Sequence, residues 1–495
     1  METIITSRSI VWLILIMLSA SLVPCAPVAA FAVTPSNPLS KSITDAKVII
    51  IARLTKYIPD PQATPPPPNA NYIKGGEEHP FYRGLNAFIV VNTLYYQGEY
   101  VFQEARMIKG NSPQVLKINL PSIMSNYYDY VRLHVQSGDW LLLLLKPGAS
   151  GGLSPVDVTV PLIPLGRLNQ DIGHEDKTQS VSSQVIQVML SSLAVSDIRQ
   201  VNTYLLRDIV DPQVVVGLAP YLDDANIETR SNVLYCMAKN QQVTVIPRIA
   251  ALEREIEKRG NGTSANTVGT LGDFTTPDAV PYLNPLLFET AYYTRLNTMF
   301  SLGKIADQTS APYLMLALRD PDPQKVIPAG AWGLLHRVVP ALKRPMDTSD
   351  AFYNHRAAET KVLYDWWNDE LNGKHIPNTP EGKKLLNYTL PDVVPVATLN
   401  TLLFQPVRTV REETISRLRK QADASSIPYL VLALQDPDTT VAYQAYKVLH
   451  QLVPTLGAEQ SATAFTANRD AATQPLYAWW NDELLGKHLP KPPVS

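Results

Sequence analysis

The sequence predicts a multidomain α+β protein, in which a small antiparallel β-barrel or sheet is followed by an α–α superhelix. Short β-branched and aromatic runs, separated by Gly, Pro, Asn and Ser, fill residues 33–165. In residues 179–490 the apolar residues instead recur at helical spacing, and a long part of this region is written twice. Residues 166–178 lack an apolar stripe, so we expect a linker between the two parts.

An apolar run from Ile10 to Val23 lies near the N-terminus and is followed by small residues. Its 14 residues fall short of the ~20 that an α-helix needs to span a bilayer. The pattern is typical of a signal peptide, and we expect residues 1–32 to be removed by cleavage near Ala30–Ala32. An uncleaved anchor is the alternative. We therefore expect the protein in the periplasm, in the cell envelope or outside the cell.

Residues 33–165 contain six runs that we predict to be strands. The runs begin at Lys47, Asn86, Gln114, Tyr130, Trp140 and Val156. So many short runs in one stretch favour a small antiparallel sheet or barrel. The string AKVIIIARL, a further strand, MIKG and then LLLLLK is similar to small OB-like barrels of exported bacterial proteins, of which tissue-inhibitor-like modules are the best known.

The helical part contains a duplication. Residues 312–322 read PYLMLALRDPD and residues 428–438 read PYLVLALQDPD, at an offset of 116. Further on, WWNDELNGKHIP at residues 366–377 recurs as WWNDELLGKHLP at residues 479–490. The duplicated segments therefore cover residues 281–377 and 395–490. A unit of two amphipathic helices cannot bury its apolar face alone, so we expect these units to stack against their neighbours.

A third, less similar copy precedes the duplication. Arg230, Arg295 and Arg411 each lie 17 residues before a Pro and have apolar residues four and seven positions later. This pattern, with Leu-x-Asp-Pro-Asp after it, resembles the HEAT repeats often found in bacterial proteins. The resemblance implies an α-solenoid scaffold that binds proteins and no particular reaction.

Composition excludes several classes of function. The net charge is −2 and only 18% of residues are charged, so no basic excess favours nucleic acid or an anionic membrane as a partner. The eight His are scattered, and no Cys-x-x-Cys or His-x-x-His spacing predicts a metal site. No Gly-x-Ser-x-Gly turn or phosphate-binding loop occurs. We therefore predict no catalysis, no cofactor and no metal, and we interpret the paired Asp of the Asp-Pro-Asp sequences as turn residues.

The aromatic ends of the duplicated segments are the candidate binding residues. We predict helices from Phe352 to Leu371 and from Phe465 to Leu484, each followed by a glycine that ends it. Adjacent residues point about 100° apart on a helix, so one Trp of each pair is expected inside and the other half-exposed. We expect the first Trp of each pair to be buried. The candidate partner-binding residues are Trp367, Trp480, Tyr353, Tyr364 and Tyr477.

These observations favour an exported protein-binding scaffold whose partner is another protein. Two alternatives remain open. Some helical-repeat proteins of this subtype are chromophore lyases, although these act in the cytoplasm and the N-terminal apolar run argues against that location. The β-module could instead inhibit a protease.

Overall fold

The computed structural model describes residues 38–59, 98–111, 115–120, 140–148, 152–156, 162–166, 178–258, 269–322, 324–342, 349–376, 383–384 and 386–488. The chain divides into two units, each with its own internal contacts. Unit 1 contains residues 1–240 and 255–267, and unit 2 contains residues 241–254 and 268–495. The expected signal peptide and residues 167–177 of the expected linker lie outside the described residues, whereas Gly166, the first residue of that linker, ends a strand. The domain boundaries at residues 165 and 179 stay predictions.

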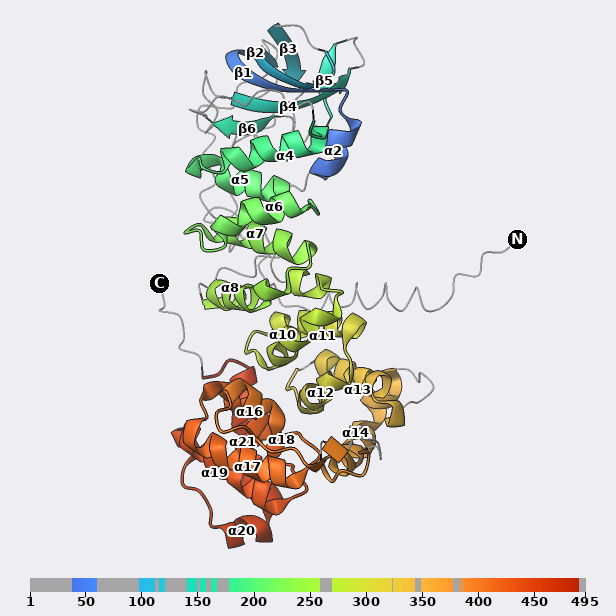
Figure 1. The fold of residues 1–495 in the computed structure, drawn as a ribbon, viewed down its shortest axis with the longest axis vertical. Helices are drawn as coiled ribbons and strands as arrows, with labels where there is room; N and C mark the ends of the chain where they lie inside the picture. Colours follow the sequence, from blue (N-terminus) through green and yellow to red (C-terminus); the bar gives the residue numbers. More distant parts are fainter. Residues whose placement is uncertain are drawn as a thin grey trace, which may run out of the picture. The chain divides into compact units, whose positions relative to one another are not determined.

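A curled antiparallel sheet forms the N-terminal part of unit 1 (Figure 1). Its strands follow the order β3-β2-β1-β4-β5, with β6 pairing with β4. The strands are β1 (Val48–Pro59), β2 (Gly98–Lys109), β3 (Val115–Leu120), β4 (Trp140–Pro147), β5 (Leu153–Pro155) and β6 (Ile163–Gly166). β1 has register shifts against β2, which bend a strand and increase its twist. The edge strands β3 and β5 contact each other, so the sheet curls back toward itself.

The core explains why β4 has five consecutive leucines. Leu141, Leu143 and Leu145 join an apolar cluster on one face of the sheet. Leu142 and Leu144 on the opposite face are also buried. That face is covered by helices, since α2 (Leu39–Asp45) contacts β4 and α4 (Val181–Ser192) contacts β2 and β6. A strand covered on both faces reads as a continuous apolar run rather than an alternating one.

Three of the predicted strands are confirmed, namely those that begin near Lys47, Gln114 and Trp140. The last predicted run overlaps β6 only at its end, and the runs from Asn86 and Tyr130 lie wholly outside the described residues. β2 is not among the predicted strands, because its sequence GEYVFQEARMIK carries charges on both faces.

The part of unit 1 that follows the sheet is helical in its described elements. α4 begins at Val181, where helical periodicity predicts it, and the hydroxyl of its N-cap Ser180 accepts a hydrogen bond from the backbone N–H of Ser183. The next helices are α5 (Ser196–Leu206), α6 (Pro212–Leu218), α7 (Ile227–Lys239) and α8 (Ile246–Lys258), the last of which is divided between the units. α5 contacts β6, and the side-chain amide of Asn202 donates to the carbonyl of Pro164.

Unit 2 is helical in all of its described elements and includes both duplicated segments. The first segment contains α10 (Val280–Leu283), α11 (Tyr292–Ile305), α12 (Ala311–Ala317), α13 (Val326–Val338) and α14 (Ser349–Leu371). The second contains α16 (Val396–Leu402), α17 (Arg408–Gln421), α18 (Ile427–Ala433), α19 (Thr439–Leu452), α20 (Ala462–Ala467) and α21 (Arg469–Leu484). Among the described residues, no helix is both long and apolar enough to cross a lipid bilayer.

The predicted tail helices are interrupted, which corrects the continuous helices expected from the sequence. The second tail breaks at Asn468, between α20 and α21. α14 leaves helical geometry at the equivalent residue, His355. Gly373 and Gly486 end the tails with positive φ, as predicted, and the N–H groups of Lys374 and Lys487 bond back to the carbonyls of Asp369 and Asp482.

Candidate functional site: the junction of the duplicated segments

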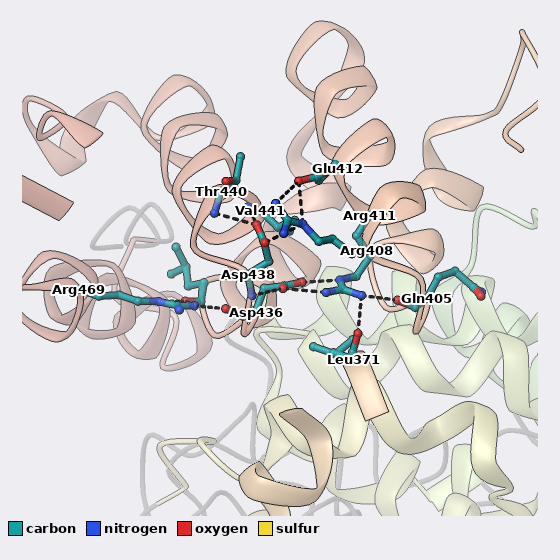
Figure 2. A network of polar contacts seen from close by, with 11 residues as sticks. Leu371, Gln405, Arg408, Arg411, Glu412, Asp436, Asp438, Thr440, Val441 and Arg469 are labelled. Carbon is teal, nitrogen blue, oxygen red and sulfur yellow. Dashed lines mark hydrogen bonds and ion pairs between the residues drawn. The ribbon is translucent and has the colours of Figure 1, made fainter. Parts of the chain in front are cut away.

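A buried ion pair lies at the centre of the second segment (Figure 2). The side chains of Arg411 on α17 and Asp436 after α18 are each 1% exposed. The Arg411 Nε and Nη2 donate to the two carboxylate oxygens of Asp436 at 2.6 and 3.0 Å. Asp436 also accepts from the backbone N–H of Asp438, so the Asp-Pro-Asp sequence forms the predicted turn. Burial raises the pKa of Asp436, and the bonds from Arg411 oppose that rise.

The same pair recurs in the first segment, and each pair also binds the tail of the other segment. Arg295 and Asp320 are likewise each 1% exposed, with Nε 2.7 Å from the carboxylate. Arg411 Nη1 donates to the carbonyl of Leu371, the last residue of α14. Arg295 Nη1 donates to the carbonyl of Leu484, the last residue of α21. Each arginine therefore satisfies a free carbonyl at a helix C-terminus, where the helix dipole favours a cation.

Two more Arg–acid pairs with the same spacing occur in unit 1, although their side chains are more exposed. Arg199 of α5 binds Asp224 at 2.6 Å, and Arg230 of α7 binds Glu255 at 2.6 Å. In all four pairs the acid follows the arginine by 25 residues. The arginine is the fourth residue of its helix each time. This spacing could have been found in the sequence, and it extends the repeat to Arg199, before the copy that the sequence predicts at Arg230.

Equivalent residues of the two segments meet at an aromatic junction. The hydroxyl of Tyr429 donates to that of Tyr313 at 3.4 Å, and these residues are 116 positions apart. Their helices, α18 and α12, are also equivalent and contact each other. A two-fold axis makes contacts reciprocal, so that a residue i of one copy contacts j of the other while j of the first contacts i of the second. The bonds from Arg295 to Leu484 and from Arg411 to Leu371 are reciprocal in this way. The duplicated segments are therefore related by an internal approximate two-fold axis, which corrects the stacking expected for this pair.

The aromatic contacts across the junction come in reciprocal pairs. The ring of Trp480, from the second tail, lies 6.3 Å from that of Phe288 in the first segment. The ring of Trp367, from the first tail, lies 5.9 Å from that of Phe404 in the second. Each tail also binds its own segment, since Arg356 donates to the Leu318 carbonyl and Arg469 to the Leu434 carbonyl. Each tail helix thus bridges both segments.

The segments differ where Arg319 occupies the position of Gln435. The guanidinium of Arg319 lies 4.1 Å from the ring centre of Tyr477 and 5.5 Å from that of Tyr364. Tyr364 and Tyr477 are equivalent residues on the two tails, so one cation lies between them. With its amide oxygen turned toward this cluster, Gln435 accepts from the Tyr477 hydroxyl at 3.2 Å and from Arg319. Burial raises the pKa of Tyr477 to about 12, so its hydroxyl remains a donor at neutral pH.

The sequence assigned burial within the Trp pairs in the wrong order. Trp367 and Trp480 are 3% and 4% exposed, whereas Trp366 and Trp479 are half-buried and stack on His375 and His488. The sequence fixes only that the two rings point in different directions. Which ring lies inside depends on the position of the other segment, because Trp367 and Trp480 pack on that segment.

The remaining candidate residues lie in two places. Tyr364 and Tyr477 are half-buried beside Arg319. Tyr353 is 40% exposed and its ring contacts that of Phe352. A role for the five candidates in binding a partner stays a prediction.

The polar groups of the junction hold the two duplicated segments together. Its buried carboxylates, Asp320 and Asp436, each bind an arginine, and burial raises the pKa of Tyr313 and of Tyr429. Within the described ranges, no cluster of three or more His, Cys, Asp or Glu side chains could hold a metal ion. Burial also raises the pKa of Cys236, in unit 1, to about 12, which makes its thiol a poor nucleophile.

A comparison with protein-family models gives no match, and a comparison with curated proteins gives none either. What the chain does must therefore be argued from its own surface.

Proposed function

We propose that the protein is a non-catalytic scaffold that binds another protein through unit 2. The observation that supports this proposal most directly is a stripe of exposed aromatic side chains on α11. Tyr293 is 43% exposed and Phe300 is 48% exposed. The two residues are seven positions apart, so they lie on one face of the helix. Tyr282, on the neighbouring α10, is 38% exposed.

The duplication provides an internal control for this stripe. At the equivalent positions of α17, 116 residues later, Thr409 and Ser416 are exposed instead. α17 forms the same buried Arg–Asp pair as α11 and packs in the equivalent place. The fold therefore does not require aromatic residues here. Exposed aromatic groups on one helix face are typical of protein interaction sites, where Tyr often contributes a large part of the binding energy.

The double variant Tyr293→Thr with Phe300→Ser tests this proposal, because it gives α11 the residues that α17 already carries. We expect the variant to cross-link no partner protein. Its free energy of unfolding should change by less than ~1 kcal/mol, as is usual for surface substitutions. Thr409→Ala with Ser416→Ala is the matched control and should leave cross-linking unchanged. Equal cross-linking by wild type and the α11 variant would show that the stripe does not bind the partner.

The finer assignments belong to the same proposal. We propose an OB-like barrel for the sheet, supported by the strand order and the contact between β3 and β5. HEAT-like pairing of the helices is supported by the four Arg–acid pairs. Export with cleavage near Ala30–Ala32 is supported by the apolar run at residues 10–23. N-terminal sequencing of the mature protein tests it: an intact Met1 on a soluble cytoplasmic protein would contradict export.

A further inference from the structure

Arg207 is a buried cation that the repeated ion pairs do not involve. It is the C-cap residue of α5, in unit 1, and it is 5% exposed. Its guanidinium carbon lies 3.9 Å from the ring centre of Tyr204 and 4.9 Å from that of Tyr235. Both tyrosines are half-buried, and the guanidinium lies close to both rings.

The hydrogen bonds of this cation are incomplete. Among the described residues, Arg207 Nε and Nη1 have no hydrogen-bond acceptor, although both atoms are buried. The buried hydroxyl of Tyr204 also lacks a partner there. The nearest carboxylate, that of Asp208, is 3.7 Å from Nε and 40% exposed. That separation permits an electrostatic attraction but is too long for a hydrogen bond.

The repeat does not explain a buried arginine at this position. Arg207 lies eight residues after Arg199, and the residues eight after Arg230, Arg295 and Arg411 are Ala238, Gly303 and Arg419. Arg419 is exposed. Helix pairs of the same kind therefore form without a cation inside.

Incomplete hydrogen bonding of a buried charge is costly, so such a group calls for a partner that completes it. Three buried donors in this cluster lack an acceptor among the described residues, two from Arg207 and one from Tyr204. Burial raises the pKa of Tyr204, which keeps its hydroxyl protonated. Donors and positive charge together select an oxyanion.

We propose that Arg207 and Tyr204 form a binding site for a small oxyanion, with Tyr235 holding the guanidinium in place. The ligand class is a carboxylate or a phosphate, whose oxygens would accept from Arg207 Nη1 and from the Tyr204 hydroxyl. Asp208 supplies part of the counter-charge in the absence of ligand.

Thermal unfolding and calorimetric titration of the full chain test this site with sodium phosphate and sodium acetate as probes, at ionic strength held constant with chloride. We expect one or both probes to raise the melting temperature of the wild type. Arg207→Met should abolish this rise, and Tyr204→Phe should weaken binding about tenfold or more, since a hydrogen bond to a charged group is lost. Arg419→Met is the matched control and should respond to the probes like the wild type.

A second measurement separates this site from a purely structural arginine. Without phosphate or acetate, Arg207→Met should melt no lower than the wild type, because it replaces an incompletely bonded buried charge with an apolar chain of similar length. The proposal is overturned if neither probe binds the wild type, or if the probes stabilise Arg207→Met equally. It is also overturned if Asp208→Asn melts far below the wild type, which would make Asp208 the permanent partner. If Arg207→Met does not fold, the affinity of Tyr204→Phe for phosphate and acetate decides the question, and an affinity equal to that of the wild type overturns the proposal.

Discussion

At the scale of single residues, the stability of unit 2 depends on side chains that reach from one duplicated segment into the other. Trp480 belongs to the second tail, but its ring packs on Phe288 of the first segment. Trp479, next to it, is half-buried and stacks on His488 of its own tail. The two residues therefore differ in burial and in the segment that they contact, although they are neighbours.

Trp480→Ala should lower the free energy of unfolding of unit 2 by ~3–5 kcal/mol, the range for removing a large buried side chain. Trp479→Ala should cost about 1 kcal/mol, because it removes a stacking contact between two partly exposed rings. Urea unfolding followed by circular dichroism measures both changes. Equal costs for the two variants, or a larger cost for Trp479→Ala, would contradict the burial that separates the two rings.

At the scale of elements, the sequence predicts those that local pattern determines. β1 and β4 are recognisable from apolar runs, α4 from its periodicity and capping Ser180, and the helix ends from Gly373 and Gly486. Prediction from the sequence fails where tertiary contacts determine where a helix is interrupted. The breaks at His355 and Asn468 lie inside periodic segments, where no Gly marks them.

The junction itself was only partly predictable, for a physical reason. The offset of 116 establishes which residues are equivalent, such as Tyr313 and Tyr429, but it does not give the operation that relates them. Translation and rotation leave the same repeat in the sequence. The buried Arg–acid pairs were detectable in principle, since their separation of 25 residues is constant. Arg207 follows no repeat, so only its surroundings reveal it.

At the scale of the whole molecule, the contacts that each tail makes with the other segment determine how unit 2 should unfold. In a stacked array each unit contacts only its neighbours, so loss of the terminal unit leaves the preceding ones largely intact. Here the second tail supplies the Leu484 carbonyl to Arg295 and the Trp480 ring to Phe288, and both of these partners belong to the first segment. Neither segment can complete its core without the other.

Hydrogen exchange of a chain ending at residue 461 should therefore show a loss of protection in the other segment. We expect amides of α11 and α12 to exchange faster than in the full chain, because Arg295 loses a carbonyl partner beside its buried ion pair. Trp480→Ala in the full-length chain is the milder variant, and it should raise exchange around Phe288 and the start of α11. If faster exchange is confined to α18 and α19 in both variants, the second tail stabilises only its own segment. Loss of protection at α11 from a change made nearly 190 residues later in the sequence would instead show that the two segments fold as one cooperative pair.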